Sequence, residues 1–241
     1  MQTRPAIYPT FPSVDLADPD GLLMLGGELN PIWILEAYRQ GIFPWPLSYE
    51  GVDLLAWFSP DPRAILELDE LHVSRRLGRR IRNGGYQVTM NQAFGQVIAG
   101  CAAPRQDEPG TWITPELMAV YRQLHELGHA HSVEVWHERT LVGGLYGVAV
   151  GGFFSGESMY HHHRDASKMA IVYLVRHLFE RGFTLLDIQQ SSLHCSMMGA
   201  REISRDKYLE RLRKAVASEV SFGSFADAAC LPVTGRKMVT G

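Results

Sequence analysis

The sequence predicts a mixed α+β or α/β protein that begins with a small N-terminal domain. From Ala64 onward, stretches with the 3.6-residue apolar period of helices alternate with short strand-like runs, as in a mixed sheet with helices on its faces. Residues 1–61 are instead rich in proline, glycine and aromatic side chains, which favours turns over long regular elements. The S-P-D-P run at residues 59–62 separates the two parts. We therefore expect domains at residues 1–61 and 62–241.

Composition limits the class of protein. The chain has 241 residues, 46% hydrophobic and 20% charged, with a formal net charge of −3, which fits an ordinary globular protein and excludes a wholly basic nucleic-acid coat. Cys101, Cys195 and Cys230 are odd in number, far apart and without metal-ligand spacing, so free thiols in a reducing compartment are expected. Neither a leader segment nor an apolar run of about twenty residues is found, so we expect a cytoplasmic protein without a membrane anchor.

Helix starts are marked by residues whose side chains cap the first turn. Asn30 and Thr114 each precede a proline, the preferred first helical residue, and an apolar face follows both. Ser74 precedes an arginine-rich stretch, and Asn91 precedes an apolar stripe that begins at Phe94. The sequence predicts helices after all four caps.

Residues 151–189 are expected to form the framework of the active site. They have the pattern of a strand, a loop, a helix and a second strand, and each strand-like end carries one carboxylate within an apolar run, Glu157 or Asp187. Because ionised carboxylates are costly to bury, such acids are paired, shifted in pKa or functional. Ser167 and Lys168 lie near the start of the helix, where backbone N–H groups favour anions.

Several familiar chemistries are not favoured. Asp187 and Gln189 share one face of a strand and could hold an attacking amine, but their spacing alone favours a satisfied polar pair at the sheet rim. Three consecutive histidines, His161 to His163, cannot all face one point, so no metal site is expected. No G-x-S-x-G elbow is present, so we expect no covalent nucleophile.

Two further groups of side chains have alternative explanations. Arg75, Arg76, Arg79 and Arg80 share one helix face; a solvated basic face is the common explanation, but in a net acidic chain the cluster favours contact with a phosphate backbone. The aromatic residues of the proline-rich N-terminal part form either a surface covered by a ligand or the core of a small domain.

Several runs in order from about residue 20 to about residue 212 resemble the leucyl/phenylalanyl-tRNA–protein transferase family. Among them are LLMLGGELNP, YRQGIFPW, WFSPDPR, GTWIT, HELGHAHSVEVW, GESMYHHHRDASK and LLDIQ. The resemblance implies a small N-terminal domain and a C-terminal domain similar to GNAT-type acetyltransferases, with α+β architecture overall. It also implies transfer of Leu or Phe, and less well Met, from aminoacyl-tRNA to N-terminal Arg or Lys of proteins, marking them for N-end rule degradation. No coenzyme A, other cofactor or metal is implied, and a monomer is expected.

The resemblance also assigns roles to residues. Asp187 and Gln189 in LLDIQ match the acid and amide of the reaction centre, where Asp187 polarises Gln189 and Gln189 assists the amine. Alternatively, groups of the tRNA supply the proton transfers and these side chains position the amine. Glu157 in GESM matches an acid that orients the substrate. The residues expected to line the pocket for the Leu or Phe side chain are Trp45, Trp112, Tyr121, Phe154 and Met159. Those expected to bind the tRNA acceptor stem are Arg75, Arg76, Arg79 and Arg80.

Two competing functions remain. A coenzyme A-dependent acetyltransferase on the same fold would need a Q/R-x-x-G-x-G/A pyrophosphate loop, which the segment HHHRDASK lacks. An RNA-binding adaptor without enzymatic activity would tolerate replacement of Asp187, whereas the transferase would not.

Overall fold

The N-terminal part of the chain forms a small antiparallel sheet beside one helix. The computed structural model describes residues 9–49, 52–104 and 111–223, so Cys230 lies outside the described residues. Strand β5 lies at the centre of a three-stranded sheet of order β1-β5-β2, and β3 pairs with β4. The elements are η1 (Val14–Leu16), β1 (Leu22–Leu25), α1 (Pro31–Arg39), β2 (Phe43–Pro44), β3 (Leu47–Tyr49), β4 (Val52–Leu54) and β5 (Ala56–Phe58).

A seven-stranded mixed sheet forms the rest, in the order β12-β6-β11-β10-β9-β8-β7. Its strands are β6 (Arg63–Leu66), β7 (Tyr86–Met90), β8 (Ala130–His137), β9 (Thr140–Val150), β10 (Phe153–His161), β11 (Leu185–Gln189) and β12 (Ala200–Ile203). The helices are α2 (Arg75–Asn83), α3 (Phe94–Ala102), α4 (Pro115–Glu126), α5 (Ala166–Glu180), α6 (Leu193–Ser196) and α7 (Arg205–Val216). The expected α+β class, with a small N-terminal region before a mixed sheet, is confirmed.

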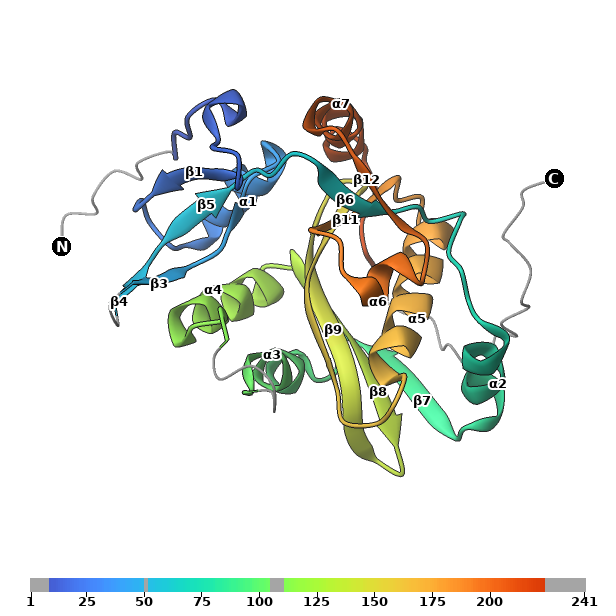
Figure 1. The fold of residues 1–241 in the computed structure, drawn as a ribbon. Helices are drawn as coiled ribbons and strands as arrows, with labels where there is room; N and C mark the ends of the chain where they lie inside the picture. The colour runs from blue at the N-terminus through green and yellow to red at the C-terminus, as the bar shows by residue number, and fades with distance from the viewer. Residues whose placement is uncertain (1–8, 50–51, 105–110, 224–241) are drawn as a thin grey trace.

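Helices cover both faces of the large sheet and enclose two apolar cores. Helices α3 and α4 lie on the face toward the N-terminal part, and α5 lies on the other face with α2 beside it (Figure 1). The first core joins Trp33, Ile34 and Tyr38 of α1 to side chains of α3, α4 and α7. The N-terminal part therefore packs into the same core as one face of the large sheet. The domain division after residue 61 stays a prediction.

Most of the helix starts agree with the sequence. Asn30, Ser74 and Thr114 accept hydrogen bonds from the backbone N–H three residues later, at 3.0, 3.2 and 3.3 Å. The prediction for Asn91 was wrong, because α3 begins only at Phe94 after a residue without a capping side chain. The Asn91 side-chain oxygen instead accepts the backbone N–H of Ser132 at 3.1 Å, which ties the end of β7 to β8.

The segment 151–189 forms the predicted strand–helix–strand unit, and its two strands stop pairing partway along their length. Strands β10 and β11 are parallel and pair through three positions, the last being Ser155 opposite Asp187. Beyond that point β10 has an irregularity between Gly156 and Ser158 against β9, and β11 has one between Asp187 and Gln189 against β6. The pairing of the central strands therefore ends within the sheet, and side chains of both strands line the space that opens there.

Candidate active site

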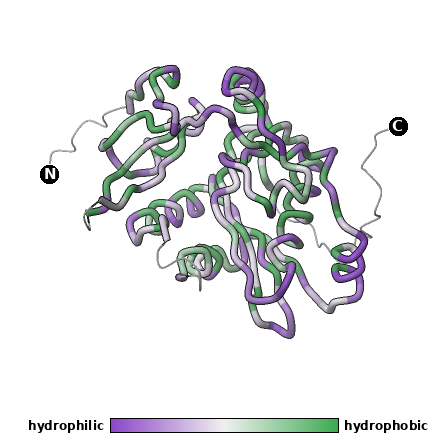
Figure 2. Tube along the Cα trace, in the orientation of Figure 1, coloured by the Kyte–Doolittle hydropathy of each residue, from purple (hydrophilic) through white to green (hydrophobic). Residues whose placement is uncertain are grey.

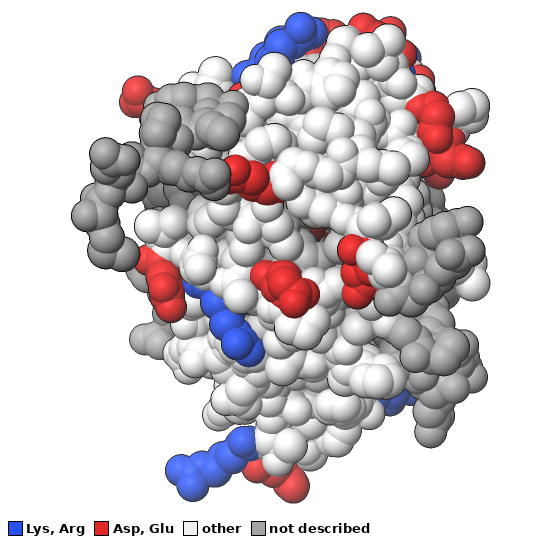
Figure 3. Space-filling model, turned by 90° about the vertical axis from the view of Figure 1, so that its left-hand side faces the viewer, with Lys and Arg blue, Asp and Glu red and all other residues white. Residues whose placement is uncertain are grey.

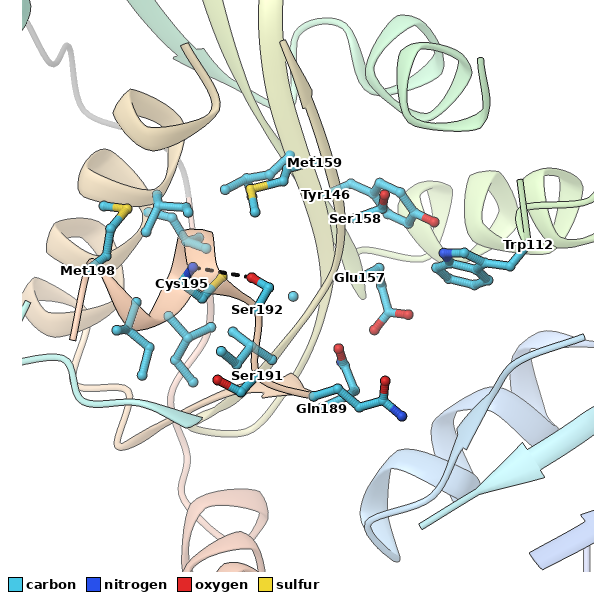
Figure 4. A pocket seen from close by; sticks show the side chains of 18 of the residues that line it. Trp112, Tyr146, Glu157, Ser158, Met159, Gln189, Ser191, Ser192, Cys195 and Met198 are labelled. Atoms are coloured by element: carbon cyan, nitrogen blue, oxygen red, sulfur yellow. Dashed lines mark hydrogen bonds between the residues drawn. The ribbon is translucent and has the colours of Figure 1, made fainter. Parts of the chain in front are cut away.

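A cavity of about 330 Å³ lies where β10 and β11 separate (Figure 4). Its apolar end lies toward α5 and α6 and is lined by Leu145, Met159, Ile171, Leu174, Leu186 and Met198. The opposite end of the cavity holds the carboxyl group of Glu157 and is also lined by Trp45, Trp112 and Gln189. The cavity thus joins an apolar recess, which excludes charged groups, to a polar mouth.

The predicted pocket residues are only partly brought together. Trp45 and Trp112 stack with ring centroids 5.0 Å apart and an interplanar angle of 17°, and both line the cavity with Met159. Phe154 is fully buried beside Phe222 and does not line it, because β10 is still paired with β11 at this position. Tyr121 is also fully buried behind the cavity and reaches it only through its hydroxyl.

The N-terminal aromatic residues divide between two places. Phe43 and Trp57 are 3% and 0% exposed and lie in the core shared with one face of the large sheet, whereas Trp45 lies on the cavity wall. That a ligand covers Trp45 stays a prediction. Through Trp45 the N-terminal part supplies a wall of a cavity that otherwise belongs to the large sheet.

Within the described ranges, Glu157 forms no ion pair. Its Oε2 accepts a hydrogen bond from the Tyr121 hydroxyl at 2.8 Å, while its Oε1 is shielded from solvent and has no hydrogen-bond partner among the described residues. Burial raises the pKa of Glu157 to about 7, although the hydroxyls of Tyr38, Ser155 and Tyr121 stabilise the charged form. A carboxyl in this state can take up or release a proton near neutral pH.

Asp187 is in the opposite situation. The Arg63 guanidinium binds it in a bidentate manner, Nε to Oδ1 at 2.9 Å and Nη2 to Oδ2 at 2.7 Å. The Tyr208 hydroxyl donates to Oδ2 at 2.9 Å and the Gln189 backbone N–H to Oδ1 at 2.9 Å. Asp187 is fully buried and is not among the residues that line the cavity, so its catalytic role stays a prediction.

Arg63 belongs to this buried ion pair as firmly as Asp187 does. It is 1% exposed, donates to the Gly41 carbonyl at 3.0 Å and lies over the rings of Phe43 and Tyr208, 4.8 and 4.6 Å from their centroids. Burial by itself would lower the pKa of Arg63, but the neighbouring Asp187 carboxylate outweighs it and raises that pKa. The carboxylate of Asp187 is thus the main group that stabilises the buried charge of Arg63.

Gln189 links the ion pair to the cavity. Its backbone has φ of +56°, an uncommon conformation for a residue other than glycine, and its N–H is held by Asp187. Its side-chain Nε2 donates to Ser155 Oγ at 2.6 Å, and the residue lines the cavity opposite Glu157 (Figure 4). Asp187 thus acts on the backbone of Gln189 and not on its side-chain amide, which differs from the expected polarisation.

The predicted basic face is present at a distance from the N-terminal part. Arg76, Arg79 and Arg80 line a shallow hollow of about 370 Å³ on α2, whereas exposed Arg75 lies outside it. Arg80 is tied down by Asp165 at 3.0 Å and by the Arg164 carbonyl at 2.8 Å. Helix α2 is strongly hydrophilic and lies on the right-hand side of the molecule as drawn in Figures 1 and 2. Figure 3 shows the opposite side, on which acidic residues are more prominent than basic ones.

The remaining motifs form no further centre. The three histidines diverge as expected: His161 approaches Ser167 at 3.4 Å, His162 packs on the Tyr160 ring, and His163 packs on Tyr86. Among the described residues, no group of three or more His, Cys, Asp or Glu could hold a metal ion. Within the same ranges, no helix is long and apolar enough to cross a membrane. Cys101 and Cys195 are buried, and neither forms a disulfide bond with a described residue.

Comparison with known proteins identifies the family. Two family models match the chain, leucyl/phenylalanyl-tRNA protein transferase over residues 65–213 and the N-terminal domain of that enzyme over residues 27–61. The chain belongs to the leucyl/phenylalanyl-tRNA–protein transferase family. A transferase of this name from Syntrophotalea carbinolica is 50% identical over 206 residues, 85% of this chain and 88% of the relative. Another from Chromohalobacter salexigens is 49% identical over 219 residues, 90% and 84% of the two chains.

Solved structures resemble this member of the transferase family only loosely. A GCN5-related N-acetyltransferase from Kribbella flavida is 13% identical with a TM-score of 0.37, covering 69% of this chain and 58% of that one. A ribosomal-protein-alanine N-acetyltransferase from Brucella melitensis is 13% identical with a TM-score of 0.33, covering 58% and 96%. The α+β class therefore rests on the strand order and helix placement described above.

Besides the apolar lining of the cavity, the sequence analysis missed polar side chains that hold the predicted site residues in place. Tyr38, Arg63, Ser155 and Tyr208 contact the predicted residues, yet nothing in their own neighbourhood indicates it. The bond between Arg63 and Asp187 spans 124 positions, and the bond between Tyr38 and Tyr121 spans 83. The signal that could have found Arg63 is a general one, since a predicted buried acid requires a cation or several donors.

Proposed function

We propose that this protein transfers an apolar aminoacyl group, Leu or Phe, from aminoacyl-tRNA to the N-terminal α-amine of an acceptor protein. The observation that carries the proposal is Glu157, a carboxyl with a pKa of about 7 and an unpartnered Oε1 at the mouth of an apolar cavity. Membership of the transferase family supports the same reaction. The N-terminal Arg or Lys of the acceptor, its marking for N-end rule degradation, action in the cytoplasm and a monomeric state are part of the proposal.

The apolar end of the cavity receives the side chain of the transferred residue. Met159 and Ile171 come from different elements and face the same recess, which has a volume that suits a Leu or Phe side chain. A charged side chain would lose its hydration there without gaining a partner, so the recess rejects it. One methylene group more or less changes binding modestly, which is consistent with acceptance of both Leu and Phe.

Glu157 is the proton acceptor of the proposed reaction. A protein α-amine has a pKa near 8, so at neutral pH it arrives mainly as an ammonium and must lose a proton before it attacks. That proton leaves to solvent. As the nitrogen of the free amine forms the new bond with the ester carbonyl carbon, Glu157 Oε1 takes one of the two protons that the nitrogen still carries. The bond from this carbon to the ribose oxygen breaks, and the proton passes from Glu157 to the departing ribose oxygen. Because the ester is already activated, positioning supplies much of the remaining rate.

Gln189 and Asp187 serve as positioning groups in this scheme. The Gln189 amide faces Glu157 across the mouth and is fixed by Ser155, so it can hydrogen-bond the aminoacyl ester or the amine. Asp187, locked by Arg63 and Tyr208, holds the Gln189 backbone in its unusual conformation. The tRNA backbone is placed on α2, where Arg76 and Arg79 contact phosphates without reading sequence.

The test is transfer of labelled Leu from Leu-tRNA to a protein that begins with Arg, with matched proteins that begin with Gly and Glu as controls. We expect product only with the Arg acceptor, and none after ribonuclease treatment. Acetylation of amines by acetyl-CoA without any tRNA would contradict the proposal and favour an acetyltransferase. Binding of tRNA without any transfer would contradict it in favour of a non-enzymatic adaptor.

A further inference from the structure

Three buried tyrosines from three different elements surround Glu157. Tyr121 comes from α4, Tyr146 from β9, and Tyr38 from α1 in the N-terminal part. All three side chains are at most 1% exposed. The hydroxyls of Tyr38 and Tyr121 lie 2.9 Å apart, and that of Tyr121 lies 2.8 Å from Glu157 Oε2. A continuous chain of hydrogen bonds therefore leads from α1 to the carboxyl.

The direction of this chain follows from counting protons. A tyrosine hydroxyl has one proton to donate. Tyr121 donates its proton to Glu157, so its oxygen can only accept from Tyr38. Tyr38 thus donates to Tyr121, and Tyr121 donates to Glu157. Each donation polarises the next, which strengthens the bond that ends on the carboxyl.

We propose that Tyr121, supported by Tyr38, is a positioning pair that holds Glu157 Oε2 and leaves Oε1 as the atom that meets the substrate amine. The pair also keeps the carboxyl ionisable inside an apolar cavity, because a donated hydrogen bond stabilises the charged form. This inference rests on the proposed function for the identity of the substrate amine. The effect of the two tyrosines on the pKa of Glu157 does not depend on the proposed function.

The other groups that face Glu157 do not replace the pair. Tyr146 on β9 has a buried hydroxyl without a partner in the described part of the chain. Ser155 on β10 and Gln189 on β11 are bonded to each other. Asp187 on β11 adds negative charge, which raises the pKa of Glu157 further, although Arg63 balances most of that charge. Besides Ser155, the tyrosine pair is what opposes the burial that raises the pKa of Glu157 to about 7.

The pair also gives the N-terminal part a chemical role. Tyr38 lies near the end of α1, and its hydroxyl is the group through which α1 reaches the carboxyl. Trp45 contributes a wall, whereas Tyr38 acts on the reacting acid itself. The N-terminal part is thereby coupled to the protonation of Glu157.

The experiment measures the titration of Glu157 directly. The carboxyl carbon-13 NMR signal of Glu157, assigned by its loss in Glu157→Gln, is followed against pH in the wild type, Tyr121→Phe and Tyr38→Phe. We expect the midpoint to rise by about one pH unit in Tyr121→Phe, because a hydrogen bond to the charged form is lost. A rise of similar size is expected in Tyr38→Phe, because the Tyr38 hydroxyl also stabilises the charged form of Glu157. The control Tyr160→Phe removes a buried hydroxyl three residues from Glu157 on the same strand, and we expect no shift.

A second readout connects the titration to transfer. The acid limb of kcat/KM should move to higher pH in Tyr121→Phe by the same amount as the NMR midpoint. An unchanged or lowered midpoint in Tyr121→Phe overturns the inference, whatever happens to the rate. A raised midpoint in a protein that shows no aminoacyl transfer supports the pair and overturns the proposed function. If Tyr121→Phe does not fold, Tyr38→Phe decides, since a rise there supports the pair and no change overturns it.

Discussion

Glu157 and Asp187 are two buried carboxyls on adjacent strands, and their surroundings could hardly differ more. Asp187 receives two hydrogen bonds from Arg63, one from Tyr208 and one from the Gln189 backbone. Glu157 receives one from Tyr121, has no cationic partner among the described residues and keeps one oxygen unpartnered. The difference arises because Ser155 and Asp187 form the last pair before the strands separate, and Glu157 lies just beyond it.

This contrast indicates that Asp187 has a structural role and that Glu157 has a role in the reaction. A carboxylate whose two oxygens are both occupied by hydrogen bonds suits a role in holding other groups in place. An unpaired carboxyl in an apolar cavity exchanges its proton near neutral pH, so it suits proton transfer. The two acids therefore have different roles, and replacing each one should have different consequences.

The largest expected effect is on the rate of transfer in Glu157→Gln. Glutamine keeps the shape of the side chain but cannot accept a proton, so single-turnover transfer should fall roughly 10²–10⁴-fold. At neutral pH the variant should be at least as stable as the wild type, because glutamine removes the cost of a buried ionised carboxyl. A fall of less than about threefold in the rate, with the fold intact, would remove Glu157 from the chemistry.

The next largest effect is on stability in Arg63→Met. Removing the guanidinium leaves the fully buried Asp187 charge uncompensated, which should lower the free energy of unfolding by about 3–5 kcal/mol. Arg201→Met is the matched control, since that side chain is 52% exposed and its pair with Glu67 is worth at most about 1 kcal/mol. Urea titrations compare the two. If both variants lose the same unfolding free energy, the buried ion pair stabilises the protein no more than a surface ion pair does.

The third effect is a pH dependence of stability that belongs to Glu157. Its pKa is raised from 4.5 to about 7 on folding, so between these values the folded state binds a proton that the unfolded state releases. The contribution of Glu157 to stability is thus fully present below pH 4.5 and decreases as pH rises toward 7, by up to about 3 kcal/mol. Unfolding free energies of the wild type and Glu157→Gln should diverge over this window, with the wild type becoming relatively less stable. A constant difference would indicate an ordinary pKa.

The smallest effects are expected at the basic face of α2, far from both acids. Arg79→Ala and Arg76→Ala should each reduce the salt dependence of tRNA binding by about one unit of slope, with equal losses for Leu-tRNA and Phe-tRNA. Stability and the pH profile of transfer should not change. Loss for only one of the two tRNAs would contradict recognition of the phosphate backbone.

Local features of the fold were predictable from the sequence, and long-range ones were not. The caps at Asn30, Ser74 and Thr114 depend on bonds across three residues, so local sequence contains the whole interaction. Asn91 has an equally good capping side chain, but its side-chain oxygen accepts the backbone N–H of Ser132 on β8, which lies 41 positions later. The choice between two partners for one amide is made by the tertiary structure.

The site shows the same division. The sequence pointed to Glu157 and Asp187, because an acid within an apolar strand always requires an explanation. It could not show which acid is paired, since that depends on Arg63 and on where β10 and β11 separate. The family resemblance implied that Phe154 lines the pocket, yet Phe154 precedes the point at which β10 and β11 separate and packs in the core.

The most direct test of the assignment is the pH dependence of single-turnover transfer in three proteins: the wild type, Glu157→Gln and Asp187→Asn. The account predicts an acid limb with a midpoint near pH 7 in the wild type, set by the pKa of Glu157. The limb near pH 7 should persist in Asp187→Asn at a lower overall rate. In Glu157→Gln it should be absent, which leaves only the limb of the acceptor amine near pH 8. A limb near pH 7 that remains in Glu157→Gln, or that disappears in Asp187→Asn, would contradict the role of Glu157 as proton acceptor.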